Sequence, residues 1–151
     1  MRKVLATTLF AALLTGCSAP DYQAMSIQEI VETTTVQEKH VWATTEFVIK
    51  GTGEGRRGEE GRWYLNSEPD YRSSNSLNVH LSRKIVDEFK TRYDLTDVKE
   101  LEGKKVRVSG LITPKAYCVN KGCPRSAVSP NPDLYYQNQL LITDLENITI
   151  I

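Results

Sequence analysis

Two short runs in which apolar and polar residues alternate constrain the fold of this chain more than any other feature. They lie within residues 61–83, separated by a polar connection that contains Pro69 and Asp70. Alternation places one face of an extended segment against a core, so each run is expected to form a β-strand. The connection is too long for a two-residue hairpin and is expected to be a structured loop. The expected core residues are Trp63, Leu65, Leu77, Val79 and Leu81, with Tyr64, Asn66, Asn78 and His80 pointing outward.

Further strands are expected on both sides of this pair. Residues from about Val41 to Gly53 are dense in β-branched and aromatic side chains. A second alternating segment covers 104–113, and we expect Pro114 to end it, because a proline has no N–H for a strand ladder. The last strand is expected at 139–143, with a short extended segment after it at 148–151.

One helix is expected between these strands. Ser82 is a suitable cap for a helix over 83–93, because four apolar residues then fall on one face. Those residues are Ile85, Val86, Phe89 and Tyr93, and the next apolar residues, Leu95, Val98 and Leu101, are expected to cover the bottom of the core.

Residues 1–16 have the pattern of an export signal. Two basic residues are followed by an uncharged, mostly apolar run that is too short to span a membrane. The run ends in Leu14-Thr15-Gly16-Cys17, which resembles the bacterial lipoprotein box. This resemblance implies cleavage before Cys17 and attachment of acyl chains to it, whereas the alternative is an ordinary signal with a cysteine nearby by chance.

The lipoprotein resemblance also implies a location. Ser18 stands where an aspartate would retain such a protein in the inner membrane, so the periplasmic face of a Gram-negative outer membrane is implied. Loss of Arg2 and Lys3 with the signal leaves 17 basic residues against 19 acidic ones. This balance lacks the basic excess typical of domains that hold nucleic acid through its phosphates.

Residues 17–40 are expected to be the lipidated tether. Ser26 and Glu29 have the spacing of a helix capping box, so a short helix over Ile27, Ile30 and Val31 is the alternative to a flexible linker.

The expected loop 114–137 carries the remaining cysteines. If Cys17 is acylated, Cys118 and Cys123 form an even pair outside the cytoplasm, where a disulfide is favoured. Free thiols are one alternative. A metal site is another, but His40 and His80 are the only histidines and neither has a ligand-like spacing. No cofactor is expected.

Several motifs resemble a group of bacterial OB-fold domains, similar to tRNA-anticodon-binding domains. They are Tyr64-Leu-Asn66, Leu101-Glu-Gly-Lys-Lys-Val-Arg-Val-Ser-Gly110 and Gln139-Leu-Leu-Ile-Thr-Asp144. The resemblance implies a mainly β fold over 41–151. In such a fold, a five-stranded barrel has one helix between its third and fourth strands. Here the barrel would follow a cleaved signal helix.

The sequence has little that indicates catalysis. It contains neither a Gly-x-Ser-x-Gly elbow nor a His-Glu-x-x-His helix. His80 is an isolated histidine on the outward face of its strand, where it is expected to be solvated and not catalytic. We therefore expect a protein that is not an enzyme.

Tyrosines and arginines are the candidate ligand-binding residues, because OB-folds bind oligonucleotides, oligosaccharides and peptides with such side chains. The alternative is that the tyrosines only flank strands and the arginines only keep the surface soluble. Two functions are weighed: an envelope-anchored binding module for a protein, peptide or glycan, and a single-stranded nucleic-acid-binding domain. The candidates are Arg62, Tyr64, Arg72, His80, Arg107, Tyr117 and Tyr135.

Overall fold

The computed structural model describes residues 21–56, 58–119 and 134–151, and this part of the chain is mainly β. Its strands are β1 (Gln23–Ala24), β2 (Val41–Val48), β3 (Gly51–Glu54), β4 (Trp63–Asn66), β5 (Leu77–Leu81), β6 (Lys105–Cys118), β7 (Leu134–Ile142) and β8 (Ile148–Ile150). Its helical segments are α1 (Ile27–Val31), the π-helical η1 (Glu32–Val36), α2 (Arg83–Tyr93), and the 3-10 turns η2 (Val98–Leu101) and η3 (Leu145–Asn147).

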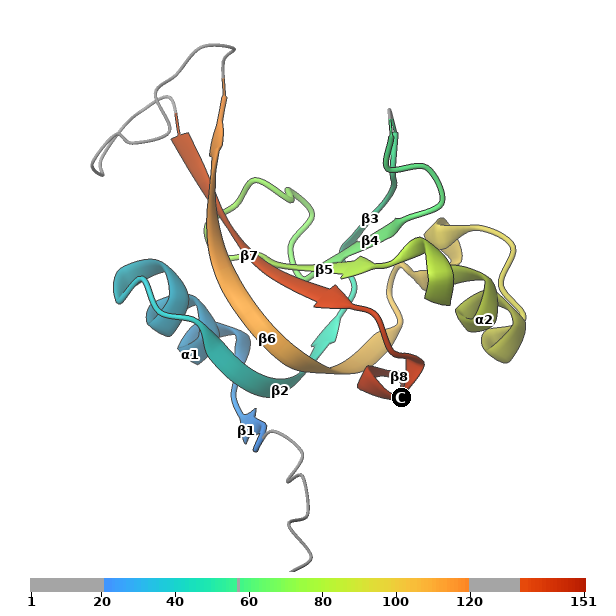
Figure 1. Cartoon of the computed structure of the whole chain (residues 1–151), viewed down its shortest axis with the longest axis horizontal. Coiled ribbons are helices and arrows are strands. Elements are labelled where there is room, and N and C mark those ends of the chain that lie inside the picture. Colours follow the sequence, from blue (N-terminus) through green and yellow to red (C-terminus); the bar gives the residue numbers. More distant parts are fainter. Residues whose placement is uncertain (1–20, 57, 120–133) are drawn as a thin grey trace, which may run out of the picture.

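The strands form one strongly curved, mixed sheet in the order β1-β2-β6-β7-β5-β4-β3, with β8 beside β6 (Figure 1). β5 and β7 pair in parallel, whereas β3–β4, β4–β5, β6–β7 and β2–β6 are antiparallel. This order, with α2 between β5 and β6, is OB-fold-like. The number of strands differs from the five expected, and the hydrogen-bonded path runs from β1 to β3 without closing on itself.

The segment expected as one strand over Val41–Gly53 is divided into β2 and β3. At the break, the N–H of Ile49 donates to the carbonyl of Lys104 at 2.9 Å, and the N–H of Lys50 donates to the carbonyl of Asn66 at 2.9 Å. The chain therefore leaves β6 and joins β4 at this corner. One bent segment thus pairs with β6 near one end of the curved sheet and with β4 at the other end.

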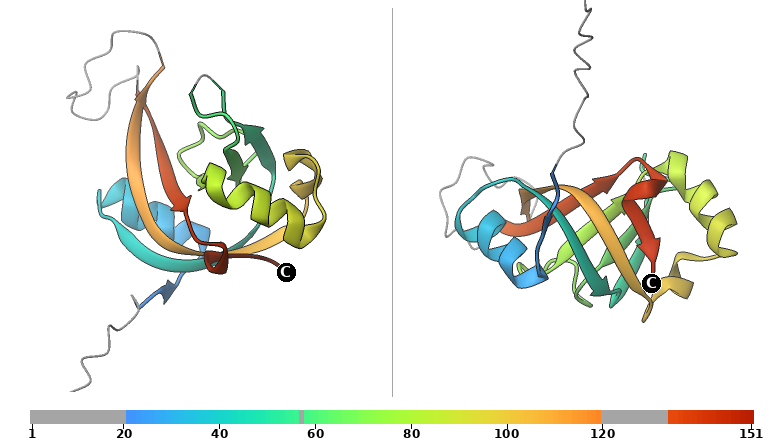
Figure 2. Two further views of the ribbon diagram at one scale, coloured as in Figure 1. Left: turned by 45° about the vertical axis from the view of Figure 1, so that its right-hand side comes forward. Right: turned by 90° about the horizontal axis from the view of Figure 1, so that it is seen from below.

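The core follows the predicted alternation. All five inward residues of β4 and β5 are fully buried, and α2 lies across one end of the curved sheet (Figure 2). Ile85, Val86 and Phe89 join this core from α2, and Leu95, Val98 and Leu101 are buried below it. The outward residues Asn66 and Asn78 are buried as well, because the loop 67–76 covers them.

The short helix at Ser26, one of the two alternatives for this region, is present. The Ser26 hydroxyl accepts from the N–H of Glu29 at 3.2 Å, and the Ser26 N–H donates to the Glu29 carboxylate at 2.8 Å. Ile30 on this helix is completely buried in the core. The packed body therefore includes residues upstream of 41, where a tether was the other alternative.

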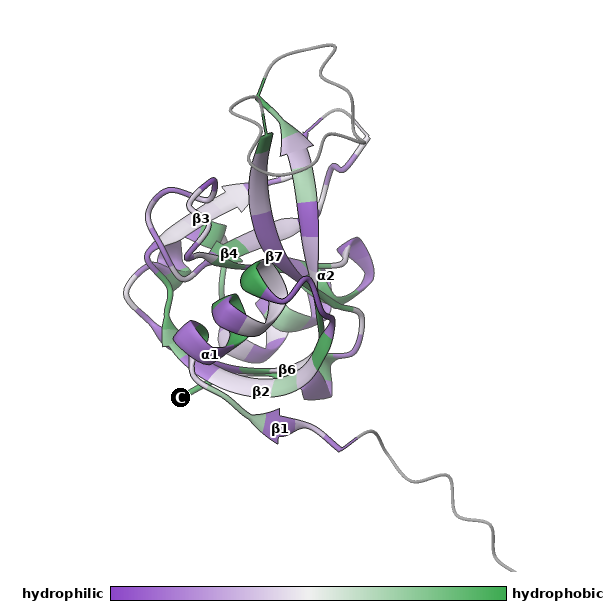
Figure 3. Ribbon diagram, turned by 90° about the vertical axis from the view of Figure 1, so that its left-hand side faces the viewer, coloured by the Kyte–Doolittle hydropathy of each residue, from purple (hydrophilic) through white to green (hydrophobic). Residues whose placement is uncertain are grey.

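The hairpin of β6 and β7 corrects two expectations. β6 continues through Pro114 to Cys118, and β7 begins at Leu134, so much of the expected loop 114–137 is paired strand. Pro114 is tolerated in β6 because the pairing of β6 with β2 ends at Ile112. On the edge that β2 has left, no strand of the described residues is present to accept a hydrogen bond from residue 114, so the missing N–H of Pro114 costs nothing there. Figure 3 shows the hairpin projecting from the sheet.

Two regions with sequence-based expectations lie outside the described residues. The signal, its lipoprotein box and Cys17 fall within 1–20, and Cys123 falls within 120–133. Acylation of Cys17 and a disulfide from Cys118 to Cys123 stay predictions. In the part of the chain that is described, each helix is too short or too polar to cross a bilayer.

Candidate ligand-binding site

A hollow of about 390 Å³ lies on the outer face of β4, β5 and β7. Alternation puts every second residue of these strands on this face, while their neighbours fill the core. The loop 67–76 and the β6–β7 hairpin form its walls. We name it the tyrosine pocket, and it is lined by Thr52, Gly53, Glu59, Tyr64, Asn66, Tyr71, Asn78, His80, Tyr117, Tyr135, Gln137 and Gln139.

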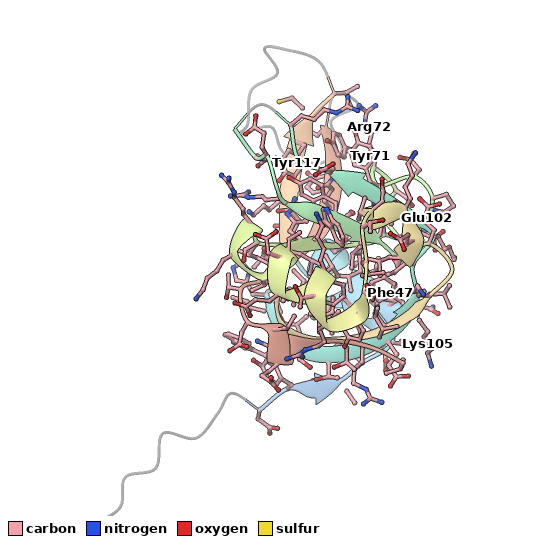
Figure 4. All side chains as sticks on the ribbon, turned by 90° about the vertical axis from the view of Figure 1, so that its right-hand side faces the viewer. Phe47, Tyr71, Arg72, Glu102, Lys105 and Tyr117 are labelled. Carbon is pink, nitrogen blue, oxygen red and sulfur yellow. The ribbon has the colours of Figure 1, made fainter. Side chains whose placement is uncertain are left out.

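Aromatic rings form the upper wall of the tyrosine pocket. Tyr117 and Tyr135 are cross-strand partners on β6 and β7, and their rings stack with centroids 5.6 Å apart. The guanidinium of Arg72 lies 5.3 Å from the ring centre of Tyr71 and 5.7 Å from that of Tyr135. Figure 4 shows Tyr71, Arg72 and Tyr117 at the same end of the molecule. The cation over the rings joins the loop wall to the hairpin wall.

Amide side chains form the floor. Gln139 Nε2 donates to the Tyr117 hydroxyl at 2.6 Å and to Gln137 Oε1 at 2.8 Å. Asn78 Nδ2 and Gln137 Nε2 both donate to the carbonyl of Tyr71, at 3.0 and 3.3 Å. These bonds fix the loop that carries Tyr71. Asn78 Oδ1, by contrast, is buried and accepts no hydrogen bond from the described residues.

His80 lies at the edge of this floor and differs from its prediction as a solvated surface residue. It is half-buried, and the Tyr64 ring meets it edge-on with centroids 4.7 Å apart. Burial lowers the pKa of His80 to about 4, and the positive charges of Lys115 and Arg62 act in the same direction. The imidazole is therefore neutral at pH 7, and the pocket gains no positive charge from it.

Tyr64 is held by an acidic neighbour. Its hydroxyl donates to Glu59 Oε2 at 2.6 Å, and burial together with this carboxylate raises the pKa of Tyr64 to about 12. Glu59 also pairs with Arg62 Nη1 at 3.1 Å. The loop before β4 is thereby attached to the rim of the pocket.

Most of the candidate residues come together, but not all. Tyr64, His80, Tyr117 and Tyr135 line the pocket, and Arg72 lies on its rim. Arg62 lines a neighbouring hollow. Arg107 lies elsewhere: its guanidinium pairs with Glu46 at 2.6 Å, across β6 and β2, so it does not contribute to this site.

Sequence reasoning did not single out the amide floor. This floor consists of Asn66, Asn78, Gln137 and Gln139, and the lining residues Thr52, Gly53 and Glu59 were also not among the candidates. Asn66 and Asn78 were already expected on the outward face, and amides repeated on one face of adjacent strands were the available signal. Among the described residues, no group of three His, Cys, Asp or Glu side chains could hold a metal ion. The site offers stacking and hydrogen bonding.

Comparison with known proteins gives little further information. No family model matches the chain, and no curated protein matches it. One similar solved structure is the S. pombe Stn1-Ten1 complex, with 17% identity, a TM-score of 0.35, and coverage of 73% of this chain and 57% of that one. Another is a putative aspartyl-tRNA synthetase from Leishmania major Friedlin, with 8% identity, a TM-score of 0.40, and coverage of 93% and 23%. At these values neither likeness indicates a ligand or an activity for this chain.

Proposed function

We propose that this protein is a non-catalytic binding module and that the tyrosine pocket is its ligand site. The observation that carries the proposal is the convergence of four tyrosines, from β4, β6, β7 and the loop 67–76, on a floor of amides. Of a protein, a peptide and a glycan, this chemistry suits a glycan best. A sugar ring has an apolar C–H face for an aromatic ring and hydroxyls for amide groups.

Charge and hydrogen bonding support the same ligand class. Glu59 is the charged residue of the described lining, and it already accepts from Tyr64, so the pocket suits an uncharged group. The amides of Asn78, Gln137 and Gln139 in the lining offer both donors and acceptors, which suit the hydroxyls of a sugar.

Binding to an array of defined oligosaccharides tests the proposal. Tyr135→Ala removes a stacked ring, and we expect it to weaken binding at least tenfold. Tyr136→Ala is the matched control, because the next residue of the same strand points to the opposite face. Equal losses in both variants, or none in either, would contradict the assignment of the pocket.

Single-stranded nucleic acid is a second candidate ligand. It is favoured by Arg72, whose position over Tyr71 and Tyr135 would suit a stacked base with a phosphate nearby. Oligonucleotide titrations at increasing salt separate the two ligands. A steep loss of affinity with salt would favour nucleic acid, because phosphate contacts release counterions.

We also propose that the protein is anchored to the outer membrane through acyl chains on Cys17. The lipoprotein-box resemblance supports this anchor and the periplasmic location. Mass spectrometry of the purified native protein tests it, with Cys17→Ala as the comparison. Retention of residues 1–16 without a fatty acid would contradict the anchor.

A further inference from the structure

A second hollow of about 390 Å³ continues from the tyrosine pocket around the outer face of the sheet. His80 and Gln139 line both hollows, so the two are contiguous at these residues. The second hollow crosses β2, β5, β6 and β7, and we name it the outer groove. It extends from the tyrosine pocket to Trp42 and Tyr22.

The outer groove exposes apolar and aromatic surface. Leu141 on β7, the register partner of His80, is 56% exposed, and Trp42 on β2, two strands further along the sheet, is 47% exposed. Tyr22 meets Trp42 with ring centroids 5.9 Å apart. A tryptophan supported by a second ring on an open sheet face is suited to stacking a flat group.

The charge of the groove differs from that of the tyrosine pocket. Its charged lining residues within the described part are Arg62 and Lys115, and none of that lining is acidic. Both cations lower the pKa of His80, and Glu59, which pairs with Arg62 at 3.1 Å, acts on it in the opposite direction. Lys115 lies on β6 between Tyr117 and Leu111, the register partner of Trp42, and so places positive charge between the tyrosine pocket and Trp42.

We propose that the outer groove is a second subsite for the same ligand and that this ligand is an acidic oligosaccharide. An uncharged unit would lie in the tyrosine pocket, its carboxylate- or phosphate-bearing neighbour would lie near Arg62 and Lys115, and a further unit would stack on Trp42. This inference rests on the proposed function of the pocket and adds the ligand's length and charge.

The spacing of charge favours an acidic glycan over an oligonucleotide. A nucleic acid carries a phosphate at every unit. One of these would have to enter the tyrosine pocket, whose charged lining residue is Glu59, with Arg72 only at the rim. An oligosaccharide can carry a single anionic group between neutral units. This arrangement matches the cations that line the outer groove and the absence of cations from the described lining of the tyrosine pocket.

An array of oligosaccharides in matched pairs tests the inference. The two members of each pair are identical except that one carries a carboxylate where the other carries a hydroxymethyl group. A thymidine decanucleotide is included as the nucleic-acid probe. We expect the acidic member to bind at least fivefold more tightly. Lys115→Gln should abolish this preference, because the acidic member should lose at least fivefold more affinity than the neutral member. Lys99→Gln, in the separate turn η2, is the control and should change neither affinity.

The outcomes separate the two proposals. Equal affinity for acidic and neutral members, or a preference for the decanucleotide, would overturn the acidic oligosaccharide. If neutral members still lost affinity in Tyr135→Ala, the proposed function of the pocket would stand. Binding that ignored Tyr135→Ala, or no binding to any member, would overturn both.

Discussion

Thr34 and Asn138 are 104 residues apart in the chain, and the Thr34 hydroxyl donates to the Asn138 amide oxygen at 2.5 Å in the buried interior. The Asn138 amide nitrogen donates in turn to the carbonyls of Ser74 and Ser76, at 3.0 and 3.3 Å. One side chain therefore ties η1, β7 and the loop 67–76 together. Since this loop carries Tyr71, the N-terminal helical segment helps to position a wall of the tyrosine pocket.

Asn138→Ala should destabilise the protein by about 2–4 kcal/mol. The change leaves several buried polar groups without partners, each at a cost of about 1–3 kcal/mol. Urea unfolding measures the effect. Asn75→Ala removes an exposed amide from the same loop and should change stability by less than about 0.5 kcal/mol. A similar loss in the two variants would contradict the role given to Asn138.

His80 should make stability depend on pH between about 6.5 and 4. Its pKa falls from an unfolded value of 6.5 to about 4 in the folded protein, so the unfolded chain binds the proton more tightly. The stabilisation is complete above pH 6.5 and is lost as the pH falls. From pH 7 to pH 5 the loss should be about 2 kcal/mol.

Chemical denaturation of the parent protein and of His80→Gln across this range measures the contribution. The variant should show a flatter profile between pH 6.5 and 5, where the carboxylates with lowered pKa, Glu29, Glu46 and Glu100, remain ionised. Parallel profiles for the two proteins would show that His80 is not held neutral by the fold.

Gly110→Ala should destabilise the protein because the side chain of Leu140 occupies the space beside the Gly110 Cα. A Cβ there would lie 2.5 Å from Leu140 Cδ1 in the core. Overpacking of this kind costs about 1–3 kcal/mol. The double variant Gly110→Ala with Leu140→Val should recover part of the loss in thermal unfolding. If the losses of stability in Gly110→Ala and Leu140→Val simply added in the double variant, the result would argue against this contact.

The sequence predicted those elements that depend on local pattern. Alternation identified β4 and β5 with the correct inward residues, and the apolar spacing after Ser82 identified α2. The spacing of Ser26 and Glu29 made α1 one of two alternatives for its region. These features are specified by residues within a few positions of one another. They can therefore be recognised without knowledge of distant contacts.

The errors concern features that depend on distant partners. Pro114 ends no strand, because β2 has already left that edge of β6. Arg107 has the right chemistry for a binding face, but Glu46 on the neighbouring strand pairs with it. The amide floor forms only when the parallel pairing of β5 and β7 brings Asn78 beside Gln139. A one-dimensional pattern does not specify which strands become neighbours.

The most direct test of the central claim is chemical-shift mapping of the full folded domain with the oligosaccharide that binds best on the array. We predict that the largest amide and side-chain shifts will occur at Tyr64, His80, Gln137 and Gln139, with a continuation toward Trp42 for an acidic probe. Shifts confined to α2 and η2, with β4, β5 and β7 unchanged, would contradict the claim that this face is the ligand site.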